Sequence, residues 1–183
     1  MRIVGGKYRH RLIDYPDDME HTRPTKDRIR EAIFSALNNI EGYEALDLYA
    51  GSGAMGLEAL SRGAKKVTFV DVSGLAIKTV KSNIASLKIP TEEYELIKDK
   101  DVNALAIFKQ RNQKFDLVFL DPPYETGEYE KIVSLLYEHD LLSKNAILVL
   151  ESNRPIVLEN LDYEKNKEYH YGEIIVNIIW RSL

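Results

Sequence analysis

Apolar residues recur along the chain with two different periods, and together they predict an alternation of helices and strands. From Ile29 to Leu37 they repeat at helical spacing, which predicts a helix with Thr25 as its N-cap that ends before Gly42. Segment 115–120 is too apolar to have an exposed face, as is typical of a parallel sheet covered on both sides. The other predicted strands lie at 45–47, 66–71, 94–98 and 146–150, and the other helices at 75–87, 102–110 and 128–137.

The two ends of the chain depart from this alternation. Residues 163–171 and 173–180 predict two strands with only a turn between them, so they are expected to be antiparallel neighbours. Residues 2–13 predict two short strands around a pair of glycines. We therefore expect an α/β fold with a doubly wound, mostly parallel seven-stranded sheet that ends in an antiparallel hairpin. The predicted parts are a short N-terminal β-hairpin arm, 1–20, and one domain, 21–183.

A glycine-rich turn follows the first strand and opens a helix. Gly51, Gly53 and Gly56 match the G-x-G-x-x-G spacing of dinucleotide-binding domains and let the backbone approach a ligand closely. Asp47, four residues before Gly51, favours a different ligand. A pyrophosphate gains nothing from a nearby anion, whereas the ammonium and sulfonium groups of S-adenosylmethionine (SAM) do. The alternative is a strand-to-helix turn with an incidental acid.

Further acids follow the next strands of the predicted sheet, at the edge where open α/β sheets bind their ligands. Asp71 ends the second strand and is placed to accept both ribose hydroxyl groups. Asp101 follows the third strand, and with Val102 it is expected to meet the amino group and ring face of adenine. The residues expected to bind the cofactor, with Thr25 near its methionine end, are Thr25, Asp47, Gly51, Ser52, Gly53, Asp71, Val72, Asp101 and Val102.

The motif Asp121-Pro-Pro-Tyr124 directly follows the fourth strand. An exocyclic amine on a nucleobase is a weak nucleophile because its lone pair is delocalised into the ring, so its methylation needs acceptors for the amine hydrogens. We expect the Asp121 carboxylate and the Pro122 carbonyl to be these acceptors, and the Tyr124 ring to hold the base. The two prolines keep the loop rigid, which preorganises the acceptors. The alternative is an ordinary turn.

Composition limits the other possibilities. A chain of 183 residues is long enough for one sizeable core, and no apolar run approaches the ~20 residues of a membrane span. The absence of cysteine excludes disulfides and thiolate metal sites, and the four histidines have no metal-like spacing, so we expect no metal and a cytoplasmic location. The net charge of −4 argues against indiscriminate nucleic-acid binding.

Basic residues are nevertheless concentrated near the N-terminus, where the first eleven residues contain four Lys or Arg and no acid. An acidic body with one basic edge can meet a polyanion through that edge alone. The alternative is a solvated basic terminus. The residues expected to contact phosphates are Lys7, Arg9, Arg11 and Arg23.

These motifs resemble the bacterial small-subunit (16S) ribosomal RNA guanine-N2 methyltransferases of the RsmD type. The resemblance rests on residues 22–25, 45–64 and 121–124, and it extends to 2–8 and 171–172. It implies the class I SAM-dependent methyltransferase fold and methyl transfer from SAM to the exocyclic N2 of one guanine. It also implies small-subunit ribosomal RNA, with ribosomal proteins bound, as the partner of what we expect to be a monomer.

Three other interpretations stay open at this point. Another amino methyltransferase, acting on DNA adenine or on a protein glutamine, shares the glycine turn and much of residues 121–124. A nicotinamide-dependent oxidoreductase uses the same glycine spacing, but it has no use for Asp47 or Asp121. A noncatalytic RNA-binding protein with this fold needs no intact acceptors after the fourth strand.

Overall fold

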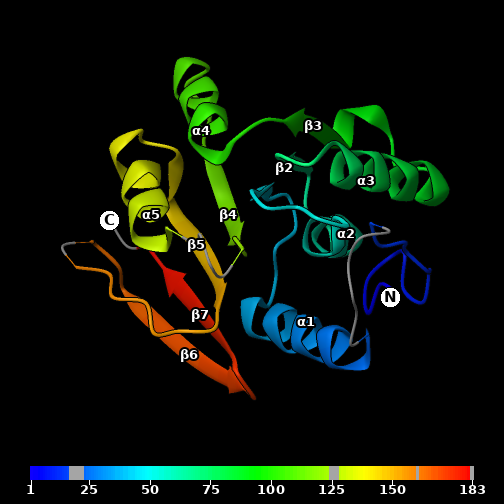
Figure 1. Ribbon diagram of the computed structural model, residues 1–183, viewed down its shortest axis with the longest axis horizontal. Helices are drawn as coiled ribbons and strands as arrows, with labels where there is room; N and C mark the ends of the chain where they lie inside the picture. The colour runs from blue at the N-terminus through cyan, green and yellow to red at the C-terminus, as the bar shows by residue number, and fades with distance from the viewer. Residues whose placement is uncertain (17–22, 124–127, 160, 182–183) are drawn as a thin grey trace.

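The computed structural model describes residues 1–16, 23–123, 128–159 and 161–181, with only the backbone of residues 23–25. A seven-stranded sheet crosses the molecule, with helices on both of its faces (Figure 1). Its strand order is β3-β2-β1-β4-β5-β7-β6. The strands are β1 (Glu44–Asp47), β2 (Lys66–Asp71), β3 (Tyr94–Lys98), β4 (Phe115–Leu120), β5 (Leu142–Ser152), β6 (Lys165–Tyr171) and β7 (Ile174–Trp180).

The pairing of the strands confirms the predicted fold class. Strands β1 to β5 are parallel to one another, whereas β7 is antiparallel to both β5 and β6. Gly172 joins the last two strands with a φ of 61°, a backbone conformation that favours glycine. The helices are α1 (Arg23–Leu37), α2 (Ala54–Ser61), α3 (Gly74–Leu87), α4 (Asp101–Gln110) and α5 (Tyr129–Glu138), with a 3₁₀ turn, η1 (Thr91–Glu93).

Helices α1, α2 and α3 cover one face of the sheet, and α4 and α5 cover the other. Five of the six residues of β4 are apolar, and the packing of the strand between the two layers explains this. Leu117 and Phe119 face the first layer, where the Phe119 ring lies 5.7 Å from that of Phe34, and Val118 and Leu120 face the second layer. All four strand residues are buried, as expected for a parallel sheet between two helical layers.

Helix α1 begins at Arg23, so the prediction of Thr25 as its N-cap is wrong. The first turn of a helix accommodates Pro24 because its missing N–H has no intrahelical acceptor at that position. The remaining predicted boundaries differ from the observed ones by a few residues at most. Among the described residues, no helix is long and apolar enough to cross a membrane.

The N-terminal segment, residues 1–16, forms a shorter version of the predicted hairpin. Arg2 and Leu12 form an isolated antiparallel bridge, and Ile3 N donates to the Arg11 carbonyl (2.9 Å) and Ile13 N to the Met1 carbonyl (3.0 Å), but the pairing does not extend into full strands. The N–H groups of Val4 and Gly5 donate to the Glu58 carboxylate (2.9 and 3.0 Å) and are therefore not available to a partner strand. Apolar residues of this segment, Met1, Ile3 and Ile13, belong to the main core, and the proposed boundary between residues 20 and 21 lies outside the described residues.

Glu58 holds this segment against the helices. Its side chain is 0% exposed and lies on α2, where it accepts hydrogen bonds from Arg30 Nε (3.0 Å) and Arg62 Nε (2.9 Å) as well as from the two backbone N–H groups. Arg30 Nη2 donates in turn to the Arg2 carbonyl. A buried carboxylate is stable only when such partners replace water. Glu58 therefore joins the N-terminal segment, α1 and α2.

We predict that Glu58→Gln lowers the free energy of unfolding by about 3 kcal/mol, because it leaves the buried Arg30 with only the partly exposed Asp27 as a charged partner. Urea unfolding at neutral pH measures this change. Glu95→Gln is the control, since it removes a more exposed ion pair with Arg111 and should change the free energy by about 1 kcal/mol or less. Equal losses in the two variants would contradict a special role for the buried carboxylate.

Candidate functional site

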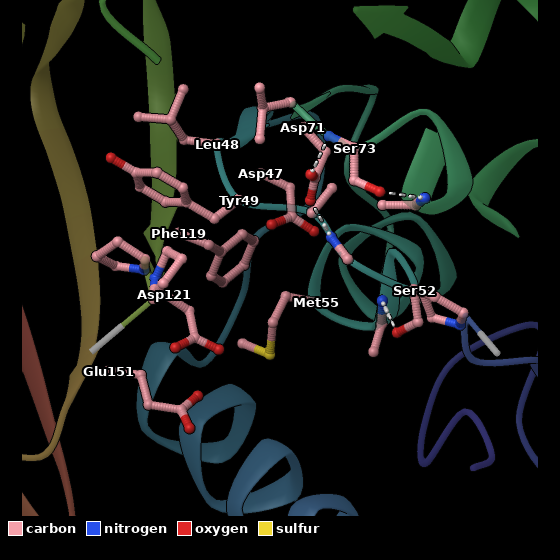
Figure 2. Close-up of a pocket in the computed structure, with 18 of the residues that line it drawn as sticks. Asp47, Leu48, Tyr49, Ser52, Met55, Asp71, Ser73, Phe119, Asp121 and Glu151 are labelled. Carbon is pink, nitrogen blue, oxygen red and sulfur yellow. Dashed lines mark hydrogen bonds between the residues drawn. The ribbon is translucent and has the colours of Figure 1, made fainter. Parts of the chain in front are cut away.

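A cavity of about 610 Å³ opens at the carboxyl ends of the parallel strands, between α1, the glycine turn and the start of α4. The strand order reverses between β1 and β4, which is where open α/β sheets bind ligands. Figure 2 shows side chains from several of these elements pointing into the same space. The fold therefore brings residues that are far apart in sequence around one site.

Five adjacent strands each contribute an acid to this cavity. In sheet order, Asp101 follows β3, Asp71 ends β2, Asp47 ends β1, Asp121 follows β4 and Glu151 lies at the end of β5. Parallel strands end at the same edge of the sheet. An acid at or just after the end of each strand therefore contributes to one row of carboxyl groups. The sequence predicted the first four acids and missed Glu151, although it stands directly after the apolar run 146–150.

Asp47 is the most enclosed of these acids, with an exposed fraction of 4%. Its Oδ2 accepts a hydrogen bond from Gly56 N (3.0 Å), and a Cβ at Gly56 would lie 2.3 Å from the Phe69 ring. Burial raises the pKa of Asp47 to about 7, the Gly56 N–H partly opposes this shift, and Asp71 adds to it. An ionised Asp47 is therefore stabilised by any cation that enters the cavity.

The glycine turn holds Asp71 in place. Gly51 N donates to Asp71 Oδ2 (2.9 Å), and Ser73 N donates to Oδ1 (2.9 Å). Each oxygen retains a lone pair, so the carboxylate can also accept two hydroxyl groups such as those of a ribose. Nothing lies within 4 Å of an added Cβ at Gly51, which leaves room for a ligand, and Val72, 64% exposed, lines the cavity beside it.

Tyr49, which was not among the predicted site residues, holds Asp101 in place. Tyr49 Oη donates to Asp101 Oδ2 (2.6 Å), and burial raises the pKa of Tyr49 above its ordinary value, with a further contribution from Asp101. Val102 N donates to Asp101 Oδ1 (2.7 Å), but Val102 is not among the residues that line the cavity. Gly53 also lies outside the lining and supplies the left-handed turn (φ 83°) before α2.

The carboxyl groups of Asp121 and Glu151 lie at the other end of the row and are directed toward each other (Figure 2). Asp121 is exposed to the cavity, yet protein atoms surround it closely enough that partial desolvation is the main reason that its pKa is raised, followed by the nearby Glu151. Burial also raises the pKa of Glu151, and Lys26 opposes both shifts. Pro122, after Asp121, is buried and lines the cavity.

The remaining predicted residues fall into two groups. Tyr124 lies outside the described residues, as do the side chains of Thr25 and Arg23. Lys7, Arg9 and Arg11 are exposed on the N-terminal segment and do not line the cavity. The same segment does contribute to the cavity wall through Met1, Tyr15 and Pro16.

The charges around the cavity suit a cationic ligand. Six acids line it, against three basic residues, and one of the three, Arg30, is already paired with Glu58. The sulfonium and ammonium groups of SAM complement this surface, whereas the pyrophosphate of a nicotinamide cofactor would meet a row of like charges. The acids are Asp47, Asp71, Asp99, Asp101, Asp121 and Glu151.

Solved structures of methyltransferases share this fold. A putative methyltransferase from Escherichia coli is 30% identical, with a TM-score of 0.85, and the match covers 100% of this chain and 98% of that one. A Thermus thermophilus 16S rRNA N2 G1207 methyltransferase in complex with AdoMet and guanosine is 16% identical, with a TM-score of 0.67, over 90% of this chain and 45% of the other. The second likeness concerns the fold alone. The fold and the acidic cavity define a SAM-dependent methyltransferase.

Comparison of the sequence with known families and relatives shows the family to which the chain belongs. The model of the family described as conserved hypothetical protein 95 matches residues 1–180, and the chain belongs to this family. A Haemophilus influenzae relative named ribosomal RNA small subunit methyltransferase D is 38% identical over 91% of this chain and 88% of its own length. The Escherichia coli K12 protein of that name is 35% identical over 83% of this chain and 74% of its own length. These relatives confirm the resemblance to the RsmD-type methyltransferases.

We predict that Asp47→Asn weakens SAM binding at least tenfold at neutral pH, because it removes a buried anion from a cationic ligand. The same change should stabilise the ligand-free protein. Between the ordinary carboxyl pKa of 3.8 and about 7, the folded protein holds a proton that the unfolded chain has released, so stability falls as pH rises through this range. The melting temperature of Asp47→Asn should therefore exceed that of the wild type by more at about pH 8 than at about pH 5.

Calorimetry with SAM and thermal unfolding at the two pH values test both parts. Asp140→Asn is the control, because Lys114 holds the pKa of Asp140 below its usual value and the sign of its effect is opposite. A melting-temperature difference that is the same at both pH values would show that Asp47 is not a strained acid. Unchanged affinity for SAM would remove Asp47 from the cofactor site.

Proposed function

We propose that this protein transfers a methyl group from SAM to the exocyclic N2 of one guanine in small-subunit (16S) ribosomal RNA. The observation that carries the proposal is the position of Asp121, which lines the same cavity as Asp47 and Asp71 and precedes two prolines. A proton acceptor for an amine is thereby placed beside the cofactor site. The printed names of the relatives support ribosomal RNA as the substrate.

For this reaction the protein has to position SAM and the amine and to accept a proton. When bound, SAM supplies an electrophilic methyl group. As the N–C bond forms and the C–S bond breaks, the amine nitrogen must lose a proton, and the Asp121 carboxylate is the acceptor that we assign to it. A raised pKa makes Asp121 a stronger base than an ordinary carboxylate. The Pro122 carbonyl as second acceptor and Tyr124 as stacking partner remain part of the proposal.

The RNA is proposed to contact the N-terminal segment. Lys7, Arg9 and Arg11 are exposed there, Arg23 is assigned with them from the sequence, and Met1 of the same segment lines the cavity. The target base must leave its stack to reach Asp121, which costs least in a single-stranded loop. About four phosphate contacts give modest affinity. We therefore infer that an RNA surface organised by ribosomal proteins, in the assembled subunit, is the preferred substrate.

We predict that Asp121→Ala lowers methyl transfer by about 10²-fold or more while SAM affinity stays nearly unchanged, because Asp121 serves the amine and not the cofactor. Small subunits from cells that lack this protein are the substrate, with labelled SAM as donor. Nucleoside mass spectrometry should show N2-methylguanosine at a single site, and more of it on assembled subunits than on naked RNA. Label in methyladenosine, DNA or protein would contradict the proposed substrate, and an active Asp121→Ala would contradict the assigned acceptor.

We predict that reversing the charges of Lys7, Arg9 and Arg11 to Glu weakens RNA binding and makes it less salt-dependent, with SAM binding unchanged. Three lost phosphate contacts should reduce the slope of log affinity against log salt by about two. Substitution is preferable to deletion of residues 1–20, because Ile3 and Ile13 are part of the core. The matched control reverses three exposed lysines on the α4–α5 side, Lys109, Lys131 and Lys144. If both triple variants lose the same affinity, the N-terminal segment has no particular role.

A further inference from the structure

We propose that Glu151 recognises the Watson–Crick edge of the target guanine beside Asp121, by accepting the N1–H that adenine and 2-aminopurine lack. This inference rests on the proposed function and adds a specificity-determining residue to it. Asp121 would accept hydrogen from N2, and Glu151 from the neighbouring N1. Both acids would then be needed to bind guanine in the orientation that presents N2 to the cofactor.

The strand register places the two acids next to each other. Leu120 of β4 pairs with Leu150 of β5, so Asp121 and Glu151 occupy corresponding positions one residue further along two neighbouring parallel strands. Both line the cavity, and Figure 2 shows their carboxyl groups directed toward the same space and toward each other. The backbone of Glu151 is fixed from two sides, because it pairs with Val176 of β7 and its carbonyl accepts a hydrogen bond from Tyr129 Oη (2.7 Å).

Nothing in the described structure accounts for this pair as a stabilising feature. Glu151 faces Asp121 across the cavity, and within the described residues neither acid forms an ion pair with a basic side chain. Lys26 attracts both groups without contacting either as an ion pair. Two carboxyl groups that face each other at close range favour sharing a proton over ionising together. A ligand that donates N–H groups to both would stabilise their ionised forms.

The order of the acids along the sheet indicates which end of the cavity faces the base that is methylated. Strand β4 lies between β1 and β5, so Asp121 lies between Asp47 and Glu151 at this edge of the sheet (Figure 2). If Asp47 and Asp71 hold SAM, Glu151 is beyond the reacting nitrogen and faces the base.

The edge of guanine matches two carboxylates. Its N1–H and N2–H₂ groups are adjacent donors, and an ionised carboxylate can only accept hydrogen bonds. Adenine and 2-aminopurine carry an unprotonated N1, which would place its lone pair against the Glu151 carboxylate. A site built to accept a hydrogen rejects an analogue that lacks it, because the buried acceptor is then left unpaired. Methyl transfer itself stays balanced as described, with the N2 proton passing to Asp121.

The test uses small-subunit RNA that carries either guanine or 2-aminopurine at the target position, bound with ribosomal proteins. Both bases have the exocyclic 2-amine, but only guanine has N1–H. The wild type should methylate guanine far faster. Glu151→Gln should lower the rate on guanine at least tenfold and reduce the preference for guanine at least tenfold, because the amide of Gln can donate to the bare N1 of 2-aminopurine. SAM affinity, measured by calorimetry, should be unchanged.

Two variants complete the test. Glu159→Gln, an exposed position after β5, removes the same charge and should behave as the wild type. Glu151→Ala should lose activity on guanine without gaining any on 2-aminopurine, and it serves if Glu151→Gln does not fold. Equal losses on both bases, or an unchanged preference, would overturn the role of Glu151 while leaving guanine methylation intact. A wild type that forms no N2-methylguanosine would instead overturn the proposed function.

Discussion

The buried Glu58 carboxylate is the interaction on which the architecture of the site depends. It accepts hydrogen bonds from two arginines and two backbone N–H groups that belong to three separate parts of the chain. One of those parts supplies Met1 and Tyr15 to the wall of the cavity, and α1 supplies Ile29 and Ile33. The parallel sheet alone would present its row of acids to open water. The Glu58 carboxylate joins the N-terminal segment and α1, and these two elements form the wall that encloses the row of acids.

The row of acids is a second constraint, and it acts against stability. Burial raises the pKa of Asp47, Asp121 and Glu151, which means that the ligand-free protein disfavours their ionised forms. A cationic cofactor and a base that donates N–H groups would each relieve part of this repulsion. Sites that are strained without ligand and relaxed with it commonly trade stability for function. The acids are therefore better explained by binding than by folding.

Much of the fold and part of the site could be predicted from the sequence because the signals are local. Each strand is a short apolar run, and Asp47, Asp71 and Asp121 stand at or directly after such runs, so the parallel topology alone brings them to one edge. What could not be predicted depends on contacts between distant residues. Glu58 meets Val4 across 54 positions, and Tyr49 meets Asp101 across 52. Glu151 differs from these cases, because it directly follows the apolar run 146–150 and so carries the same local signal as Asp121.

The N-terminal segment was expected as an arm, but it forms part of the cavity wall and contacts α3. Asn83 of α3, only 2% exposed, accepts a hydrogen bond from Asp14 N (2.8 Å) and donates to the carbonyls of Asp14 and Ser52 (3.0 Å each). One amide therefore joins the segment that carries the basic residues to the turn that lies beside Asp71. Separating either from Asn83 breaks hydrogen bonds, each of which costs about 1 kcal/mol or more when a buried partner is left unpaired. The segment assigned to RNA and the turn assigned to SAM are thus joined by one side chain.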